Sequence, residues 1–275
     1  MKRDSQERDI RLWDSSASAY DRFERRWHYY ERVGERLVRA LPLRPDSEVL
    51  ELACGTGACT ARLAEGVPLG HVLAVDQSSQ MLGFARRNTG HVGRRLSFLQ
   101  GDAGKVLRAL RKRRRAFDFV VCNSAFWQLS DVGNLLGDVR GVASSRGLLG
   151  FNLPFWFRSK GEYLRYRKTI NGVLLKYGVD SREFWSRRRP VDYPKLLADS
   201  SFRVVKDTRY YIAMDEVERL EWRRIPAFRR RWGAFRGLPR KVALEVRKEL
   251  ETESRPWPEN RDLRSKWRLI LAEAL

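Results

Sequence analysis

Two closely spaced glycines follow an apolar run that carries an acid. Within residues 49–60 the run stops at Glu51 and gives way to Cys54-Gly55-Thr56-Gly57. Glycine can turn at positive φ and lets the backbone lie against a ligand with no Cβ in the way. The amides of a following helix can then face a bound polar group. Thr60 stands where dinucleotide-binding enzymes have a third glycine, so that pattern fails.

A second acid lies at the end of the next apolar run. The strand expected within residues 71–82 ends in Asp76, nineteen residues after Gly57. In a nucleotide-binding βαβ unit, an acid at the tip of the second strand accepts hydrogen bonds from the ribose hydroxyls. The position of Asp76 therefore predicts that a nucleoside binds at this edge of a parallel sheet.

Two more strands are expected to deliver polar residues to the same edge. The segment 96–103 carries Asp102, and the segment 117–126 ends its apolar run at Asn123-Ser124-Ala125. With the first two strands they predict a parallel α/β sheet whose ligand lies at the carboxyl ends of the strands.

These motifs together resemble those of a known enzyme family. The order Glu-x-x-Cys-Gly-Thr-Gly, Asp-x-Ser-x-x-Met-Leu and Gly-Asp-Ala is similar to that of the class I S-adenosylmethionine-dependent methyltransferases. Within them it is most similar to the branch of ubiquinone and menaquinone C-methyltransferases and many natural-product enzymes. The resemblance covers about residues 15–155, and it departs at Ala53, where many members have an additional glycine. It implies a Rossmann-like seven-stranded sheet, S-adenosyl-L-methionine as cofactor and methyltransferase activity.

The resemblance also implies a role for each motif. Glu51 would orient the amino-acid end of the cofactor through water, Asp76 would hold the ribose, and Asp102 would meet the adenine. For Glu51 and Asp102 the alternative is a helix cap or a surface acid. Tyr20, in Ala19-Tyr20-Asp21, would lie across the cofactor as a lid residue. The cofactor-binding residues expected are Tyr20, Glu51, Ala53, Cys54, Gly55, Gly57, Asp76, Gln77, Met81, Asp102, Ala103, Asn123 and Ser124.

No catalytic residue is identified with the same clarity. Holding donor and acceptor in line can contribute about 7 to 11 kcal/mol, so a protein nucleophile is not required. His28 and Tyr29 are the candidates for a general base, although His28 shares a helix face with three acids, which favours solvation. Aromatic residues would line the acceptor pocket or simply pack a cap. The residues expected there are Trp127, Phe155, Tyr163 and Tyr166, with Tyr29.

The remaining segments predict how the chain is organised. An apolar stripe over 20–41 predicts one amphipathic helix, with Glu24, Glu31 and Glu35 on its solvent face. A helix is expected from 131 to about Ser145, and Gly147 would open a fifth strand. A sixth strand is expected at 202–213, and the segment 266–274 would form a closing antiparallel strand, while further helices are expected near 190–200, 214–224 and 239–250. The domains expected are N-terminal lid helices at 1–45, a cofactor-binding core at 46–154, cap insertions at 155–190 and 214–262, returning core at 191–213 and a final strand at 263–275.

The composition and charge limit the kinds of partner and the cellular compartment that we expect. The net charge is +21 over 275 residues, and residues 151–275 carry 30 basic against 17 acidic residues. Such a charge attracts anions, although the arginine runs could equally be solvated faces. The first residues are charged and no long apolar window occurs, so we expect a soluble cytoplasmic protein with no membrane span. The three cysteines predict neither a disulfide framework nor a metal site.

Three functions remain open on the sequence. The first is methyl transfer to a small, largely apolar molecule, with or without an acidic or phosphorylated handle: an isoprenoid or quinone precursor, a polyketide or acyl thioester, or an aromatic natural product. The second is RNA methylation, favoured by arginines interleaved with aromatic residues. The third is a cofactor-binding scaffold or non-methylating enzyme. Asn152-Leu153-Pro154-Phe155 resembles the tetrad of nucleic-acid adenine methylases, but it follows the fifth strand rather than the fourth.

Overall fold

The computed structural model describes residues 2–129, 131–154, 160–178, 180–182, 191–229, 241, 244–245, 248–249 and 264–275. The chain divides into two compact units. The sheet unit comprises Met1–Pro154, Asp192–Ile212 and Lys266–Leu275, and the second unit comprises Phe155–Val191 and Ala213–Ser265. Among the described helices, none has the length and apolar character needed to cross a membrane.

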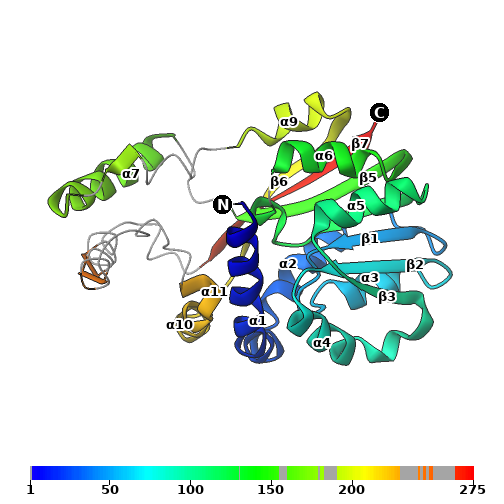
Figure 1. Ribbon diagram of the computed structural model, residues 1–275, viewed down its shortest axis with the longest axis horizontal. Helices are drawn as coiled ribbons and strands as arrows, with labels where there is room; N and C mark the ends of the chain where they lie inside the picture. The colour runs from blue at the N-terminus through cyan, green and yellow to red at the C-terminus, as the bar shows by residue number, and fades with distance from the viewer. Residues whose placement is uncertain are drawn as a thin grey trace. The chain divides into compact units, whose positions relative to one another are not determined.

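The sheet unit is built on a seven-stranded sheet with the order β3-β2-β1-β4-β5-β7-β6 (Figure 1). The pairs that join β3, β2, β1, β4 and β5 are all parallel, and β7 is antiparallel to β5. The expected Rossmann-like seven-stranded fold and its antiparallel closing strand are therefore confirmed. The strands are β1 Glu48–Leu52, β2 His71–Asp76, β3 Leu96–Gln100, β4 Phe117–Cys122, β5 Ala143–Pro154, β6 Phe202–Ile212 and β7 Ser265–Ala274.

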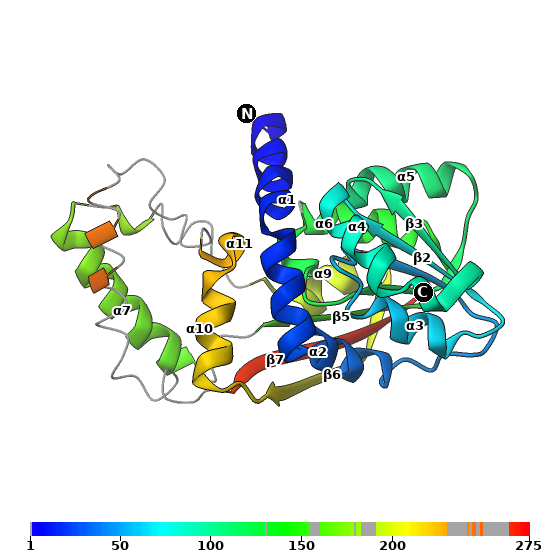
Figure 2. The same cartoon turned by 90° about the horizontal axis from the view of Figure 1, so that it is seen from below.

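Helices cover both faces of this sheet (Figure 2). Leu37 and Leu63, from α2 and α3, pack against one face, whereas Leu107, Leu136 and Leu197, from α5, α6 and α9, pack against the other. The helices of the sheet unit are α1 Lys2–Trp27, α2 Tyr29–Val38, α3 Thr60–Gly66, α4 Ser79–Asn88, α5 Ala103–Lys112, α6 Val132–Arg140 and α9 Tyr193–Asp199, with 3-10 turns at Gly90–Arg95 and Phe126–Gln128. The second unit contains α7 Lys160–Lys176, α10 Glu216–Arg224 and α11 Pro226–Arg229.

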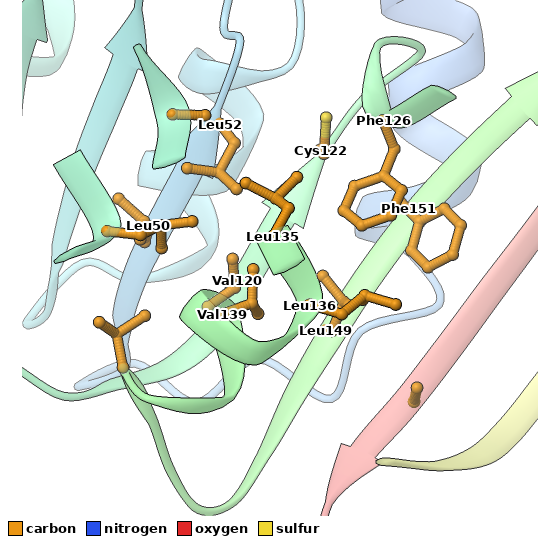
Figure 3. Close-up of a cluster of buried hydrophobic side chains, with 14 of the residues drawn as sticks. Leu50, Leu52, Val120, Cys122, Phe126, Leu135, Leu136, Val139, Leu149 and Phe151 are labelled. Carbon is orange, nitrogen blue, oxygen red and sulfur yellow. The ribbon is translucent and has the colours of Figure 1, made fainter. Parts of the chain in front are cut away.

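The main core lies between the sheet and helices α5, α6 and α9 (Figure 3). Leu50 and Val120 from the central strands and Leu136 from α6 belong to this one buried cluster, and the rings of Phe126 and Phe151 stack with their centroids 4.3 Å apart. Parallel strands covered on both faces have nearly continuous apolar sequences. This is why the first and fourth strands could be recognised as short apolar runs.

The single helix predicted over residues 20–41 is wrong, because the chain breaks at His28. This residue has a left-handed backbone with φ 50°, and it separates α1 from α2. Glu24, expected on the solvent face, is buried instead. Its carboxylate accepts hydrogen bonds from the amides of Tyr30 and Glu31, at 3.0 and 2.7 Å. Glu24 thus caps the second helix from the last turn of the first, which helical periodicity cannot reveal.

The boundary between α6 and β5 also differs from the prediction. The helix ends at Arg140 rather than near Ser145, and β5 begins at Ala143, so Gly147 lies within the strand. The Phe117 amide donates to the carbonyl of Val142 at 2.9 Å, which starts the ladder early. A register irregularity between β4 and β5 then accommodates these additional residues. Such a bulge leaves little trace in a sequence pattern.

Candidate active site

The loops after β1, β2 and β4 meet at one edge of the sheet. Leu52 is in register with Val75, and Glu51 is in register with Val121. Because these strands are parallel neighbours, their carboxyl ends lie level with one another. The glycine turn, Asp76 and Asn123 are therefore brought together, as the sequence predicts.

Residues of the glycine turn have left-handed backbone conformations, and there is free space beside one of them. Ala53, Gly55 and Gly57 have φ values of 54°, 58° and 90°. A Cβ on Gly57 would come within 3.0 Å of Thr89 Cγ2, whereas a Cβ on Gly55 would meet nothing within 4 Å. Gly57 is thus required for packing against the end of α4, and Gly55 leaves room for a ligand. Ala53, where relatives often have glycine, adopts the left-handed conformation at a cost of about 1–2 kcal/mol.

The hydroxyl of Thr56 lies in the same turn. Thr56 is buried, and its Oγ1 has no hydrogen-bonding partner among the described residues. A buried polar atom normally has a partner, so this oxygen suits a bound polar ligand. Together with the open space beside Gly55, it fits the amino-acid tail of the expected cofactor.

Asp76 ties two of these loops together. Its Oδ2 accepts a hydrogen bond from the amide of Gly55, and its Oδ1 accepts one from the amide of Ser78, both at 2.9 Å. Burial raises the pKa of this carboxyl, while these backbone bonds oppose the rise. A carboxylate has about four acceptor positions, so two remain for ribose hydroxyls. The ribose-binding role stays a prediction.

Glu51 is almost completely buried, with an exposed fraction of 1%. The hydroxyl of Thr60 donates to its Oε2 at 2.6 Å. Burial raises the pKa of Glu51 to about 8, and the nearby Asp76 acts in the same direction. The alternative of a surface acid is therefore wrong. A cation bound beside this side chain would shift it toward the ionised form.

Asp102 occupies the position of a helix cap, which was its alternative interpretation. Its Oδ1 accepts a hydrogen bond from the Lys105 amide at 3.0 Å at the start of α5. Ala103 is the first residue of that helix and is buried. Met81 is buried in α4, next to the half-exposed Gln77. The backbone of these residues lies at the carboxyl edge of the sheet, where the sequence analysis expects the ligand. Their contact with adenine stays a prediction.

Helix α1 is attached to the cofactor loops by two carboxylates that the sequence analysis missed. Asp14 Oδ1 accepts hydrogen bonds from Ser78 Oγ, at 2.6 Å, and from the Gln80 amide, at 3.3 Å. Asp21 Oδ1 accepts one from Asn88 Nδ2 at 2.8 Å, and the same amide donates to the carbonyl of Thr56. The only sequence signal was that Asp21 follows Tyr20 in the segment Ala19-Tyr20-Asp21.

Tyr20 lies between α2 and the cofactor edge. Its ring stacks on that of Tyr30, with centroids 5.2 Å apart. Burial raises the pKa of Tyr20 well above its usual value, and the nearby Tyr30, Glu24 and Asp76 contribute in the same direction. The lid role of Tyr20 stays a prediction.

The two candidates for a general base are occupied by other contacts. Tyr29 is buried, and its hydroxyl oxygen accepts a hydrogen bond from Trp267 Nε1 at 3.2 Å. His28 is exposed, with its Nδ1 2.7 Å from Glu31 Oε2. Both contacts are structural, so neither residue gains support as a base.

The expected acceptor aromatics are described only in part. Trp127 is half-buried and packs against the main core. Phe155 lies outside the described residues. Tyr163 and Tyr166 belong to α7 in the second unit, and their side chains are outside the described part of the chain. Whether these residues share one pocket stays a prediction.

Comparisons with known proteins agree with this geometry. A methyltransferase domain model matches residues 49–147. The malonyl-acyl carrier protein O-methyltransferase of Geobacter sulfurreducens is 30% identical over 238 residues, which cover 83% of each chain. The corresponding protein of Halalkalibacterium halodurans is 30% identical over 149 residues, 52% of this chain and 53% of that one. The trans-aconitate 2-methyltransferase of Deinococcus radiodurans is 32% identical over 118 residues, 43% and 42% of the two chains.

The chain thus spans about half the length of the latter two relatives and most of the Geobacter protein. Among solved structures, a methyltransferase from Geobacter sulfurreducens in complex with S-adenosyl-L-homocysteine superposes with a TM-score of 0.56 at 18% identity. That similarity covers 96% of this chain and 98% of that one, and it supports the fold.

Proposed function

Because the chain belongs to the class I S-adenosylmethionine-dependent methyltransferases, we propose that it methylates a carboxylate oxygen of a small acidic metabolite or acyl thioester. The cofactor supplies a methyl group on a positively charged sulfur. The protein's own residues then have to hold the two reactants in line and close together. Asp76, Glu51 and the glycine turn would hold the cofactor, and residues at the carboxyl ends of β4 and β5 would hold the acceptor.

A carboxylate acceptor needs no general base, because it is already ionised at neutral pH. This agrees with the positions of the histidines, which all have other partners. His28 lies beside Glu31, His71 Nε2 is 2.6 Å from Ser97 Oγ, and His91 lies 3.7 Å from Glu65. Each imidazole is thus accounted for by a contact that has no part in methyl transfer.

The observation that carries the preference for an acid is Lys266. This lysine is buried, with an exposed fraction of 9%, and its ammonium has no ion pair or hydrogen bond within the described part of the chain. Trp267 pairs with Pro154, so Lys266 lies just past the carboxyl end of β5, at the ligand edge of the sheet. The side chain has little exposed surface and no anionic partner among the described residues, so its ammonium can pair with an anion that binds at this edge. An acceptor carboxylate would supply that anion.

The relatives support the same class of acceptor. The curated names specify a malonyl group in one case and trans-aconitate in the other. Both of these groups carry a free carboxylate. The two names share no other feature of shape or size, so the shared chemistry is the anionic oxygen rather than a particular carbon skeleton.

RNA methylation gains no comparable support. The exposed run Arg111–Arg115 begins in the last turn of α5 and ends before β4, which begins at Phe117. It therefore lies at the amino ends of the strands, opposite to the edge where Asp76 and Asn123 meet. A basic surface there cannot guide a nucleotide to the methyl donor.

The proposal is tested with purified protein and S-adenosylmethionine. Malonyl-acyl carrier protein, malonyl-coenzyme A, trans-aconitate and their carboxyl-blocked esters serve as acceptors, and mass spectrometry detects the products. We expect base-labile methyl esters from the free acids and none from the blocked forms. Equal transfer to the blocked forms, or label only on nitrogen or carbon, would contradict the proposal. Cofactor binding without transfer to any acceptor would instead favour a scaffold.

Lys266→Ala tests the role of the buried cation. Charged hydrogen bonds contribute about 1.5–3 kcal/mol, so the KM for the acid should rise about 10- to 100-fold. Lys266→Arg should retain much of the affinity. Binding of S-adenosylhomocysteine, measured by calorimetry, should stay the same in both variants. A parallel loss of cofactor binding would show that Lys266 is needed only for folding.

A further inference from the structure

Asn152 is a fully buried polar side chain near the end of β5, with an exposed fraction of 0%. Both ends of its amide are used inside the protein. Its Oδ1 accepts a hydrogen bond from the amide of Ser124 at 2.6 Å, and its Nδ2 donates to the carbonyl of Val33 at 3.2 Å. The side chain therefore connects the turn after β4 to helix α2. Because it is fully buried, this amide is not presented to a target base, which argues against the role that its Asn-x-Pro-aromatic motif has in adenine methylases.

Ser124 is held in a conformation that it does not favour. Its φ is 62°, in the left-handed region, which costs a residue with a Cβ about 1–2 kcal/mol. Three contacts fix it besides the bond to Asn152 through its amide. Its Oγ donates to Asn123 Oδ1 at 3.2 Å and lies 3.4 Å from Asn152 Oδ1, and its carbonyl accepts from Gln128 Nε2 at 3.3 Å. Strained residues that the surrounding structure holds this firmly cluster at functional sites. The conformation of Ser124 therefore points to a function for this turn.

The turn after β4 also contacts helix α2 directly. Asn123 Nδ2 donates to the carbonyl of Tyr30 at 3.0 Å. A Cβ on Gly34 would come within 3.0 Å of Asn123 Nδ2 and 3.1 Å of Cys59 Cβ, so the helix lies very close to both loops. Tyr30 in turn stacks on Tyr20, the expected lid residue. The turn after β4, helix α2 and the lid thus form one continuous set of contacts.

We propose that Asn152 is a positioning residue for methyl transfer, which fixes the Ser124 turn against helix α2 and thereby sets where the acceptor lies. This inference rests on the proposed function, because it assumes that the acceptor binds beside the turn after β4. The amide acts through Ser124 and α2, and it has no contact with the reacting atoms. Ser124 is expected to reach only the methyl-donating end of the cofactor, so the effect should appear mainly in the rate of transfer and much less in cofactor binding.

The physical reason is the steep dependence of transfer on geometry. A misplacement of about 1 Å can reduce the rate roughly 100-fold. Removing the Asn152 amide would leave the Ser124 N–H buried without an acceptor, and the left-handed turn would lose the bond that holds it. The turn would then relax, while Asp76 and the glycine turn would keep their own contacts.

The experiment is a double-mutant cycle between Asn152→Ala and Ser124→Gly. Glycine adopts the left-handed conformation without strain, so the turn should depend less on Asn152 in that background. We expect Asn152→Ala to lower kcat about 10- to 100-fold in the wild-type background and less than 5-fold beside Ser124→Gly, a non-additivity typical of residues in one network. The affinity for S-adenosylhomocysteine should change less than 3-fold. Asn134→Ala, which removes an exposed amide bonded to Asp131, is the matched control.

Hydrogen exchange supplies a readout that does not need the acceptor. In Asn152→Ala, amides of residues 122–129 should exchange faster, whereas those of residues 53–60 should not change. Failure of the wild-type protein to methylate any acid would refute the proposed function. Hydrogen exchange would then still test whether Asn152 fixes the Ser124 turn. Unchanged exchange over 122–129, additive effects on kcat, or an equal loss of cofactor affinity would each overturn it.

Discussion

The expected cofactor edge consists of the loops after β1 and β2, and the proposed acceptor side consists of the turn after β4 with its contacts to α2 and β7. These two regions are assembled in different ways. At the cofactor edge, Asp76 binds the amides of Gly55 and Ser78, which are 21 and 2 residues away in sequence. On the acceptor side, Asn152 binds Val33 across 119 residues, and Trp267 binds Tyr29 across 238. The turns of the first region are held by one carboxylate from the neighbouring strand, with helix α1 attached across 64 and 67 residues, whereas the second region depends on side chains from still more distant segments. A substrate site built from side chains of distant segments can change its residues while the cofactor site keeps its own.

The largest effect should come from the acid at the centre of the cofactor edge. Asp76→Ala removes the ribose acceptor and leaves two loop amides unpaired, so we expect the affinity for S-adenosylhomocysteine to fall at least about 100-fold, near 3 kcal/mol. Asp76→Asn should fall less, because it keeps one acceptor. Calorimetry measures both, with Asp46→Ala, an exposed acid before β1, as control. Unchanged affinity in Asp76→Ala would remove the basis of the cofactor site.

A smaller effect should come from the titration of Glu51. Its pKa of about 8 means that the acid is largely neutral at pH 6.5, whereas a bound cation favours the carboxylate. Cofactor affinity should therefore rise about 30-fold between pH 6.5 and pH 9, with release of a proton on binding below pH 8. Calorimetry in buffers of different ionisation enthalpy detects that proton. Glu51→Gln should flatten the profile, and a wild-type affinity that does not depend on pH would contradict the role of Glu51.

The buried cap between α1 and α2 should make stability depend on pH. Burial raises the pKa of Glu24 to about 7. The folded state thus keeps a proton that the unfolded state releases above pH 4.5, so the free energy of unfolding should fall as pH rises from 4.5 to 7. The fall from this group should be roughly 3 kcal/mol. Urea unfolding at several pH values measures it. Glu24→Gln, which resembles the protonated acid, should remove this part of the slope, and an identical slope in that variant would contradict the assignment.

The smallest effect should come from the basic run at the opposite edge. Replacing Arg113, Arg114 and Arg115 by alanine should leave kcat/KM for a small acid within about 2-fold, because these exposed side chains lie far from the ligand edge. The assay of methyl esters measures this directly. A large loss of activity would mean that the two edges of the sheet communicate, and steep salt-dependent binding of tRNA that the substitutions abolish would favour an RNA substrate.

The sequence predicted which strand ends meet at the cofactor edge because the elements that form them are local. A strand, a glycine turn and an acid at the next strand tip recur at short spacing, and the order of strands follows from the parallel α/β fold. The errors lie where distant groups decide the outcome. The break at His28 depends on the carboxylate of Glu24, and the early start of β5 depends on pairing with Phe117. Periodicity records which residues are apolar, and it does not record which amide a buried carboxylate will accept.

By itself, the sequence determined the family, the sheet and which polar residues meet at its carboxyl edge, because these depend on backbone geometry within about a hundred consecutive residues. Only the tertiary structure showed where Glu24, Asn152 and Lys266 lie. The first caps a helix, the second joins a strained turn to helix α2, and the third has little exposed surface at the carboxyl edge and no counter-charge among the described residues. Each role depends on neighbours that folding brings together. The energies involved come from burial and hydrogen bonding, which a linear pattern of residue types cannot specify.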